Sequence, residues 1–176
     1  MKQLPILLYY HGGAFCVMSS ASAVYHNYLN SLAAKADVLT VSVNYRLAPK
    51  NPLPAAYDDS WEALRWVVDG TDPWLSDFEN LGNIILAGNS AGGNISHNLG
   101  LKLGSAGMKV EGLVLIHSSG SQVYAVCVIY PCKKSVESYE TYGINRLFKI
   151  LESDRDKRSY FDEISGDLRS VHKVGE

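Results

Sequence analysis

Short apolar runs alternate with helical patterns over the first two thirds of the chain, and this alternation limits the possible folds more than any other feature. Four brief runs rich in Ile, Leu, Val or Tyr predict strands at Leu4–Tyr10, Val38–Asn44, Asn83–Gly88 and Gly112–His117. The segments between them predict helices from Ser22 to about Ala36, over Pro54–Asp69 and from Ser90 to about Leu103. This order predicts an α/β fold with a mostly parallel sheet and flanking helices.

The pattern changes after residue 117. Residues 118–121 have the composition of a loop, Val123–Tyr130 is compatible with a further strand, and Val136–Glu152 has apolar positions near helical spacing. The last two dozen residues are mostly charged and polar, which is typical of a solvated or disordered tail. We therefore divide the chain into a core over residues 1–117 and a divergent tail over residues 118–176, partly helical or disordered.

Composition excludes several classes of function. A chain of 176 residues predicts one domain, and a formal net charge of −2 provides no basic field for nucleic acid. No apolar stretch approaches the roughly 20 residues that a membrane span needs. Three cysteines, Cys16, Cys127 and Cys132, show no paired metal-ligand spacing, which favours a reducing, cytoplasmic location without a disulfide framework or a metal site.

The pentapeptide Gly88-Asn89-Ser90-Ala91-Gly92 matches Gly-x-Ser-x-Gly and lies directly between a predicted strand and a predicted helix. A serine on such a tight turn projects its hydroxyl, and the helix N-terminus beneath it favours developing negative charge. Glycines are needed on both sides where a Cβ would clash with neighbouring backbone. This motif makes Ser90 the candidate nucleophile, whereas a Gly/Ser turn that only caps a helix is the structural alternative.

A second motif, His11-Gly12-Gly13-Ala14-Phe15, follows the first predicted strand. Its glycines are able to turn backbone N–H groups toward one point, as acyl transfer requires when charge develops on the carbonyl oxygen. In this kind of fold such groups join the N–H of the residue after the nucleophile, here Ala91. A flexible turn is the structural alternative, but two motifs in the appropriate order are more specific than either alone.

Three further segments accompany these motifs: Tyr25–Leu29, the run Val41–Pro49 with its continuation to Asp59, and Gly112–His117. With them, about residues 2–117 resemble the plant carboxylesterases of the hormone-sensitive-lipase-like branch of α/β-hydrolases. The resemblance implies a partial α/β-hydrolase fold that acts on small carboxylic esters without a cofactor. It also implies Ser90 as the nucleophile and an oxyanion hole made by the N–H groups of Gly12, Gly13 and Ala91.

The chain departs from this family at both ends. Family members have additional strands and a lid ahead of the His-Gly-Gly strand, so we expect the core to be incomplete at its N-terminus. In the family, the acid and base follow the nucleophile on loops after two further strands, whereas this sequence leaves the family pattern near Ser118. A truncated, frameshifted or alternatively spliced product would have this form.

Four of the five histidines are not placed to act as the general base. His97 follows Ser90 by two helical turns and faces away from it, so we assign His97 a structural role. His11 is expected to fix the oxyanion turn, and His26 is expected on the surface of an amphipathic helix. His117 ends a strand at the edge where ligands collect, but it precedes the position of a family base.

The remaining histidine, His172, completes a catalytic triad only by its order along the chain. The order Ser90, Asp154, His172 is available, but the interval between the last two barely holds a helix and a strand. Asp58 and Asp59 precede the nucleophile and are expected to organise the helix that begins near Pro54. We therefore assign no acid or base.

Three functions follow from these observations. The first is a carboxylic ester hydrolase, truncated or impaired, whose partner is a small-molecule ester. The second is a non-catalytic, hormone-binding protein of the same fold, resembling the gibberellin receptors. The third is an inactive product, because four family strands with uncovered sheet edges bury little apolar area against the entropy of the chain. The sequence gives no oligomeric state.

Overall fold

A five-stranded sheet forms the centre of the molecule. The computed structural model describes residues 4–70, 72–76, 79–108, 110–116 and 126–128. Within them the strand order is β2-β1-β3-β4-β5. The strands are β1 (Leu4–Tyr10), β2 (Leu39–Val43), β3 (Glu79–Asn89), β4 (Gly112–Ile116) and β5 (Val126–Val128). The first four are parallel and β5 is antiparallel to β4, which confirms the predicted α/β architecture.

The strand boundaries agree closely with those predicted. Strand β1 has the predicted bounds, and β2 is one residue shorter at each end. Strand β3 begins at Glu79, ahead of the predicted Asn83, and the register between β1 and β3 shifts between Leu4 and Ile6. This irregular, mixed-polarity start gives no apolar run, so the sequence pattern reveals only the later part of the strand. Strand β5 lies within the predicted Val123–Tyr130.

In the part of the chain that the structure describes, four helices connect the strands: α1 (Ala23–Ala36), α2 (Ala55–Asp69), α3 (Pro73–Ser76) and α4 (Ala91–Ser105). The three long helices were predicted, whereas α3 is too short to produce a periodic pattern. Helix α2 ends at Asp69 and is capped by Gly70, whose φ of 57° is the left-handed conformation that glycine adopts readily. Ser22 occupies the N-cap position of α1, but its hydroxyl accepts the N–H of Ser19 at 3.0 Å instead of capping the helix.

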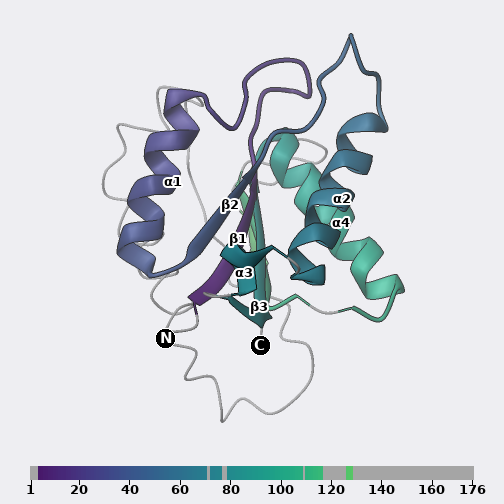
Figure 1. Ribbon diagram of the computed structural model, residues 1–176. Coiled ribbons are helices and arrows are strands. Elements are labelled where there is room, and N and C mark those ends of the chain that lie inside the picture. Colours follow the sequence, from purple (N-terminus) through teal and green to yellow (C-terminus); the bar gives the residue numbers. More distant parts are fainter. Residues whose placement is uncertain (1–3, 71, 77–78, 109, 117–125, 129–176) are drawn as a thin grey trace.

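The helices cover both faces of the sheet. Helix α1 lies on one face, and α2 and α4 lie on the other (Figure 1). Alternate residues of β1 therefore enter two separate cores: Leu7 and Tyr9 pack toward α1, whereas Ile6, Leu8 and Tyr10 pack toward α2 and α4. Burial on both faces explains why the strands read as continuous apolar runs instead of alternating ones.

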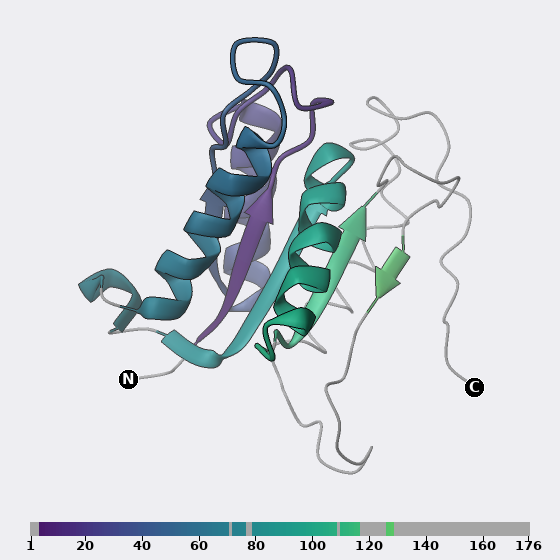
Figure 2. The same cartoon turned by 90° about the vertical axis from the view of Figure 1, so that its right-hand side faces the viewer.

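The loops that follow β1 and β2 lie together at the carboxyl end of the parallel strands (Figure 2). The turn from β3 into α4 is at the same end, because β3 is parallel to both. This is the edge at which open α/β sheets bind ligands. The fold thus brings both sequence motifs to one end of the sheet. Within the described residues, no helix has the length and apolar character needed to cross a membrane.

The first turn of α4 packs directly on the end of β1. A Cβ added to Gly92 would overlap the carbonyl oxygen of Tyr10 and lie 2.7 Å from that of His11. By contrast, a Cβ at Gly104, near the other end of α4, has no atom within 4 Å. Only the first of these two glycines is therefore required by packing.

We predict opposite effects of alanine at these two positions. Gly92→Ala is expected to lower the free energy of unfolding by about 3 kcal/mol or more, because the methyl group forces α4 away from β1. Gly104→Ala is the matched control and is expected to raise it by roughly 0.5–1 kcal/mol through lower chain entropy. Urea denaturation measures both values, and equal effects of the two substitutions would contradict this packing.

Candidate active site

Ser90 forms a sharp turn between β3 and α4. Its φ of 52° and ψ of −114° place a non-glycine residue in a region that costs of order 1–3 kcal/mol. The N–H of Ser90 donates to the carbonyl oxygen of Ile116 in β4 at 2.7 Å, and its carbonyl oxygen accepts the first helical hydrogen bond, from Asn94. The surrounding sheet and helix therefore hold Ser90 in this conformation, with its side chain half-buried.

The glycines of the motif allow the turn to close. A Cβ at Gly88 would overlap the carbonyl group of Gly92, and a Cβ at Gly92 would overlap Tyr10. Strand β3, helix α4 and strand β1 meet here with backbone against backbone. The spacing Gly-x-Ser-x-Gly is thus a packing requirement of the turn that presents Ser90.

The segment after β1 forms a second unusual turn. Three consecutive residues have positive φ: Gly13 at 118°, Ala14 at 52° and Phe15 at 62°. A Cβ at Gly13 would overlap the carbonyl oxygen of Val17. The carbonyl oxygen of Gly13 accepts the N–H groups of Cys16 and Val17 at 2.9 and 3.0 Å. The turn is therefore closed by its own backbone.

The two motifs lie against each other. A Cβ at Gly12 would lie 2.7 Å from Asn89 Oδ1 and 2.9 Å from the carbonyl oxygen of Asn89, the residue before Ser90. The structure thus brings the predicted nucleophile Ser90 and the predicted oxyanion turn together.

Among the predicted oxyanion donors, Gly12 needs a correction. Its N–H donates to Tyr25 Oη at 3.0 Å, so its single proton is already used. The N–H of Ala91 belongs to the first turn of α4, where amide groups have no partner within the helix. The donor roles of Gly13 and Ala91 stay predictions, and Gly12 instead ties the turn to α1.

His11 is fully buried and belongs to the turn, as predicted. Its Nδ1 donates to the carbonyl oxygen of Gly12 at 2.7 Å, and its ring stacks on Tyr45 with centroids 4.3 Å apart. Its Nε2 is buried and has no hydrogen-bond partner among the described residues. Burial lowers the pKa of His11, because the charged imidazolium would lose its water there.

The other histidines do not supply a base within the described residues. His26 is exposed on α1, as predicted, and its Nε2 lies 3.1 Å from Asn30 Nδ2. His97 is exposed on α4. His117, Asp154 and His172 lie outside the described residues.

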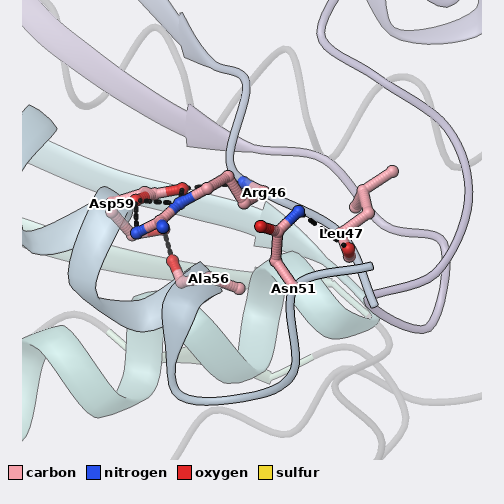
Figure 3. A network of polar contacts seen from close by, with 6 residues as sticks. Arg46, Leu47, Asn51, Ala56 and Asp59 are labelled. Atoms are coloured by element: carbon pink, nitrogen blue, oxygen red, sulfur yellow. Dashed lines mark hydrogen bonds and ion pairs between the residues drawn. The ribbon is translucent and has the colours of Figure 1, made fainter. Parts of the chain in front are cut away.

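Asp59, in the N-terminal half of α2, joins this helix to the loop after β2. Its carboxylate faces Arg46, which follows β2 (Figure 3). Arg46 Nη2 lies 2.6 Å from Asp59 Oδ1, and the backbone N–H of Arg46 donates to Oδ2 at 2.8 Å. Hydrogen bonds from Arg46 lower the pKa of Asp59. The same loop reaches the oxyanion turn, because the N–H of Ala48 donates to the carbonyl oxygen of Phe15 at 2.8 Å.

Three tyrosines of the site were missed by the sequence reasoning. Tyr25 and Tyr45 hydrogen-bond the backbone of the oxyanion turn, and Tyr57 Oη donates to Asn94 Oδ1 at 2.6 Å. All three lie in segments that carry the family resemblance, but their aromatic rings predict only burial. No group of three His, Cys, Asp or Glu side chains suited to a metal occurs in the part of the chain that the structure describes.

Burial of neutral His11 predicts a loss of stability in mild acid. Its pKa is below the usual 6.5 in the folded chain, so the unfolded chain binds the proton more readily as the pH falls through 6.5. The wild type is therefore expected to lose unfolding free energy from this group between about pH 7.5 and about pH 5.5.

Urea denaturation at the two pH values measures this loss. His11→Gln is expected to reduce it, whereas His26→Gln, at an exposed position, is expected to retain it. The same pH dependence in all three proteins would show that His11 is not the responsible group.

Comparison with known proteins agrees with this arrangement. A family described as the alpha/beta hydrolase fold matches residues 7–163. Probable carboxylesterase 3 of Arabidopsis thaliana is 44% identical over 118 residues, which are 66% of this chain and 38% of that protein. The 2-hydroxyisoflavanone dehydratase of Glycyrrhiza echinata is 44% identical over 126 residues, which are 64% of this chain and 38% of that protein.

A solved structure shows the same fold. The esterase of Pyrobaculum calidifontis superposes with a TM-score of 0.57 and 38% identity, over 65% of this chain and 36% of that one. The chain spans less than half the length of the curated relatives named above. The predicted resemblance to plant carboxylesterases is confirmed, and because the family match covers most of the sequence, the chain belongs to the alpha/beta hydrolase family.

Proposed function

We propose that this chain carries the nucleophile and oxyanion half of a carboxylic ester hydrolase site, with Ser90 as the nucleophile. The observation that supports this most is the strained conformation of Ser90 beside the turn at residues 11–15. A hydrogen bond to Ile116 and close backbone packing maintain a conformation that serine rarely adopts. Strain of this kind is characteristic of functional sites.

In the proposed reaction, Ser90 Oγ attacks the carbonyl carbon of a small ester and forms a new C–O bond. The carbonyl electron pair moves onto oxygen, and this oxyanion accepts hydrogen bonds from the N–H groups of Gly13 and Ala91. Collapse of the tetrahedral intermediate releases the alcohol and leaves an acyl group on Ser90. Water then attacks the acyl group and releases the acid.

The proton of Ser90 needs an acceptor, and none of the described histidines is placed to be one. His11 is buried with Nδ1 bonded to Gly12, whereas His26 and His97 are exposed on helices. Binding and oxyanion stabilisation alone retain roughly 10³–10⁴-fold catalysis over water in enzymes whose triads have been removed. We therefore expect slow hydrolysis unless a residue outside the described ones acts as base.

The names of relatives favour ester hydrolysis over other reactions but do not decide it. A carboxylesterase-named protein and a dehydratase-named protein match similar shares of this chain, 66% and 64%, at the same identity of 44%. Ester hydrolysis makes direct use of a projecting serine hydroxyl, which is why we favour it. The competing function is binding of a small molecule without turnover. The cytoplasmic location and the small-ester partner stay predictions.

Fluorophosphonate labelling tests this proposal, because the probe reacts faster with a serine held beside oxyanion donors than with an ordinary serine hydroxyl, and faster still where a base is present. Intact mass spectrometry of the wild type is expected to show one adduct, which Ser90→Ala lacks. Hydrolysis of p-nitrophenyl acetate by the wild type, lost in Ser90→Ala, is expected in parallel. A cooperatively folding wild type that shows neither adduct nor hydrolysis would contradict the proposal and favour ligand binding.

A further inference from the structure

Two tyrosine hydroxyls hold the same peptide group at the start of the oxyanion turn. Tyr45 Oη donates to the carbonyl oxygen of His11 at 2.6 Å, and the N–H of Gly12 donates to Tyr25 Oη at 3.0 Å. These two backbone atoms belong to the single peptide between residues 11 and 12. Because a trans peptide directs its C=O and N–H to opposite sides, the two hydroxyls approach from opposite directions.

The tyrosines come from the two faces of the sheet. Tyr25 lies on α1 and belongs to the core on that face, whereas Tyr45 follows β2 and belongs to the core beneath α2 and α4. Both side chains are almost fully buried. Burial raises the pKa of both phenols, so that both hydroxyls keep their protons and Tyr45 remains a donor at neutral pH.

The next peptides of the turn are held as well. His11 Nδ1 donates to the carbonyl oxygen of Gly12, and that carbonyl shares a peptide with the N–H of Gly13. The carbonyl oxygen of Gly13 accepts the N–H groups of Cys16 and Val17. The direction of the Gly13 N–H therefore depends on a chain of fixed peptides that begins between His11 and Gly12.

We propose that Tyr25 and Tyr45 are positioning residues that clamp the His11–Gly12 peptide from both faces of the sheet and thereby orient the Gly13 N–H. This inference rests on the proposed function and extends it to two residues outside both motifs. Neither hydroxyl needs to touch the substrate. Misplacement of a catalytic group by about 1 Å costs up to roughly 100-fold in rate. Two hydrogen bonds that fix the orientation of this peptide therefore help to preserve the reaction rate.

Tyr25→Phe and Tyr45→Phe test the clamp, because each removes one hydroxyl and keeps the ring. Tyr10→Phe is the matched control: Tyr10 is also fully buried, and its hydroxyl donates to a backbone carbonyl, that of Ser60, at 3.2 Å. All three variants lose one buried hydrogen bond. Only the first two lose a hydrogen bond to the oxyanion turn.

The first measurement needs no activity. Amide hydrogen exchange of Gly12, followed by NMR, is expected to accelerate at least about tenfold in Tyr25→Phe, because a freed amide exchanges with solvent. Tyr10→Phe is expected to leave this rate unchanged. An unchanged Gly12 rate in Tyr25→Phe would overturn the clamp.

The second measurement is the kinetics of fluorophosphonate labelling at Ser90. The maximal labelling rate is expected to fall about tenfold in Tyr25→Phe and in Tyr45→Phe, with little change in the concentration for half-maximal rate. The double variant is expected to lose less than the product of the two losses, because both hydroxyls hold one peptide. Labelling that slows no more than in Tyr10→Phe would overturn the proposal.

The two readouts separate the clamp from the proposed function. A wild type that does not label contradicts the function, and the Gly12 exchange then decides the clamp alone. Faster exchange in Tyr25→Phe, but not in Tyr10→Phe, would support a clamp that shapes the turn. Unchanged exchange together with no labelling would overturn both.

Discussion

The close packing of α4 on the end of β1 is the constraint on which the rest of the site depends. Gly92 leaves no room for a Cβ against Tyr10, and Gly88 leaves none against Gly92. This contact draws the turn at Ser90 toward the turn at residues 11–15. The unfavourable backbone conformation of Ser90 persists because sheet and helix hold it on both sides.

The oxyanion turn at residues 11–15 is fixed by hydrogen bonds to its backbone as well as by packing. Successive peptides of the turn are bonded to Tyr45, Tyr25 and His11, and then to the backbone of the turn itself. Arg46 and Asp59 join the loop after β2 to α2, and Ala48 joins that loop to the turn. The site is therefore built from several elements of the core.

The sequence predicts most of this fold because strands buried on both faces form continuous apolar runs that are bounded by turn-forming residues. It also predicts the two motifs, since glycine spacing reports backbone contacts directly. It does not predict the use of Gly12, whose amide could serve Tyr25 or an oxyanion equally well until the fold is known. The roles of Tyr25 and Tyr45 were missed because a buried aromatic ring does not reveal what its hydroxyl bonds. Pairing of Asp59 with Arg46 is likewise a tertiary contact, although a role in α2 was expected.

A crystal structure of the chain with a phosphonate bound to Ser90 would test the central claim most directly, because the phosphoryl oxygen occupies the place of the oxyanion. The account predicts that this oxygen lies about 2.7–3.1 Å from the backbone nitrogens of Gly13 and Ala91. It also predicts that the N–H of Gly12 remains bonded to Tyr25. A phosphoryl oxygen turned away from both nitrogens, or bound by Gly12 after loss of its bond to Tyr25, would contradict the account.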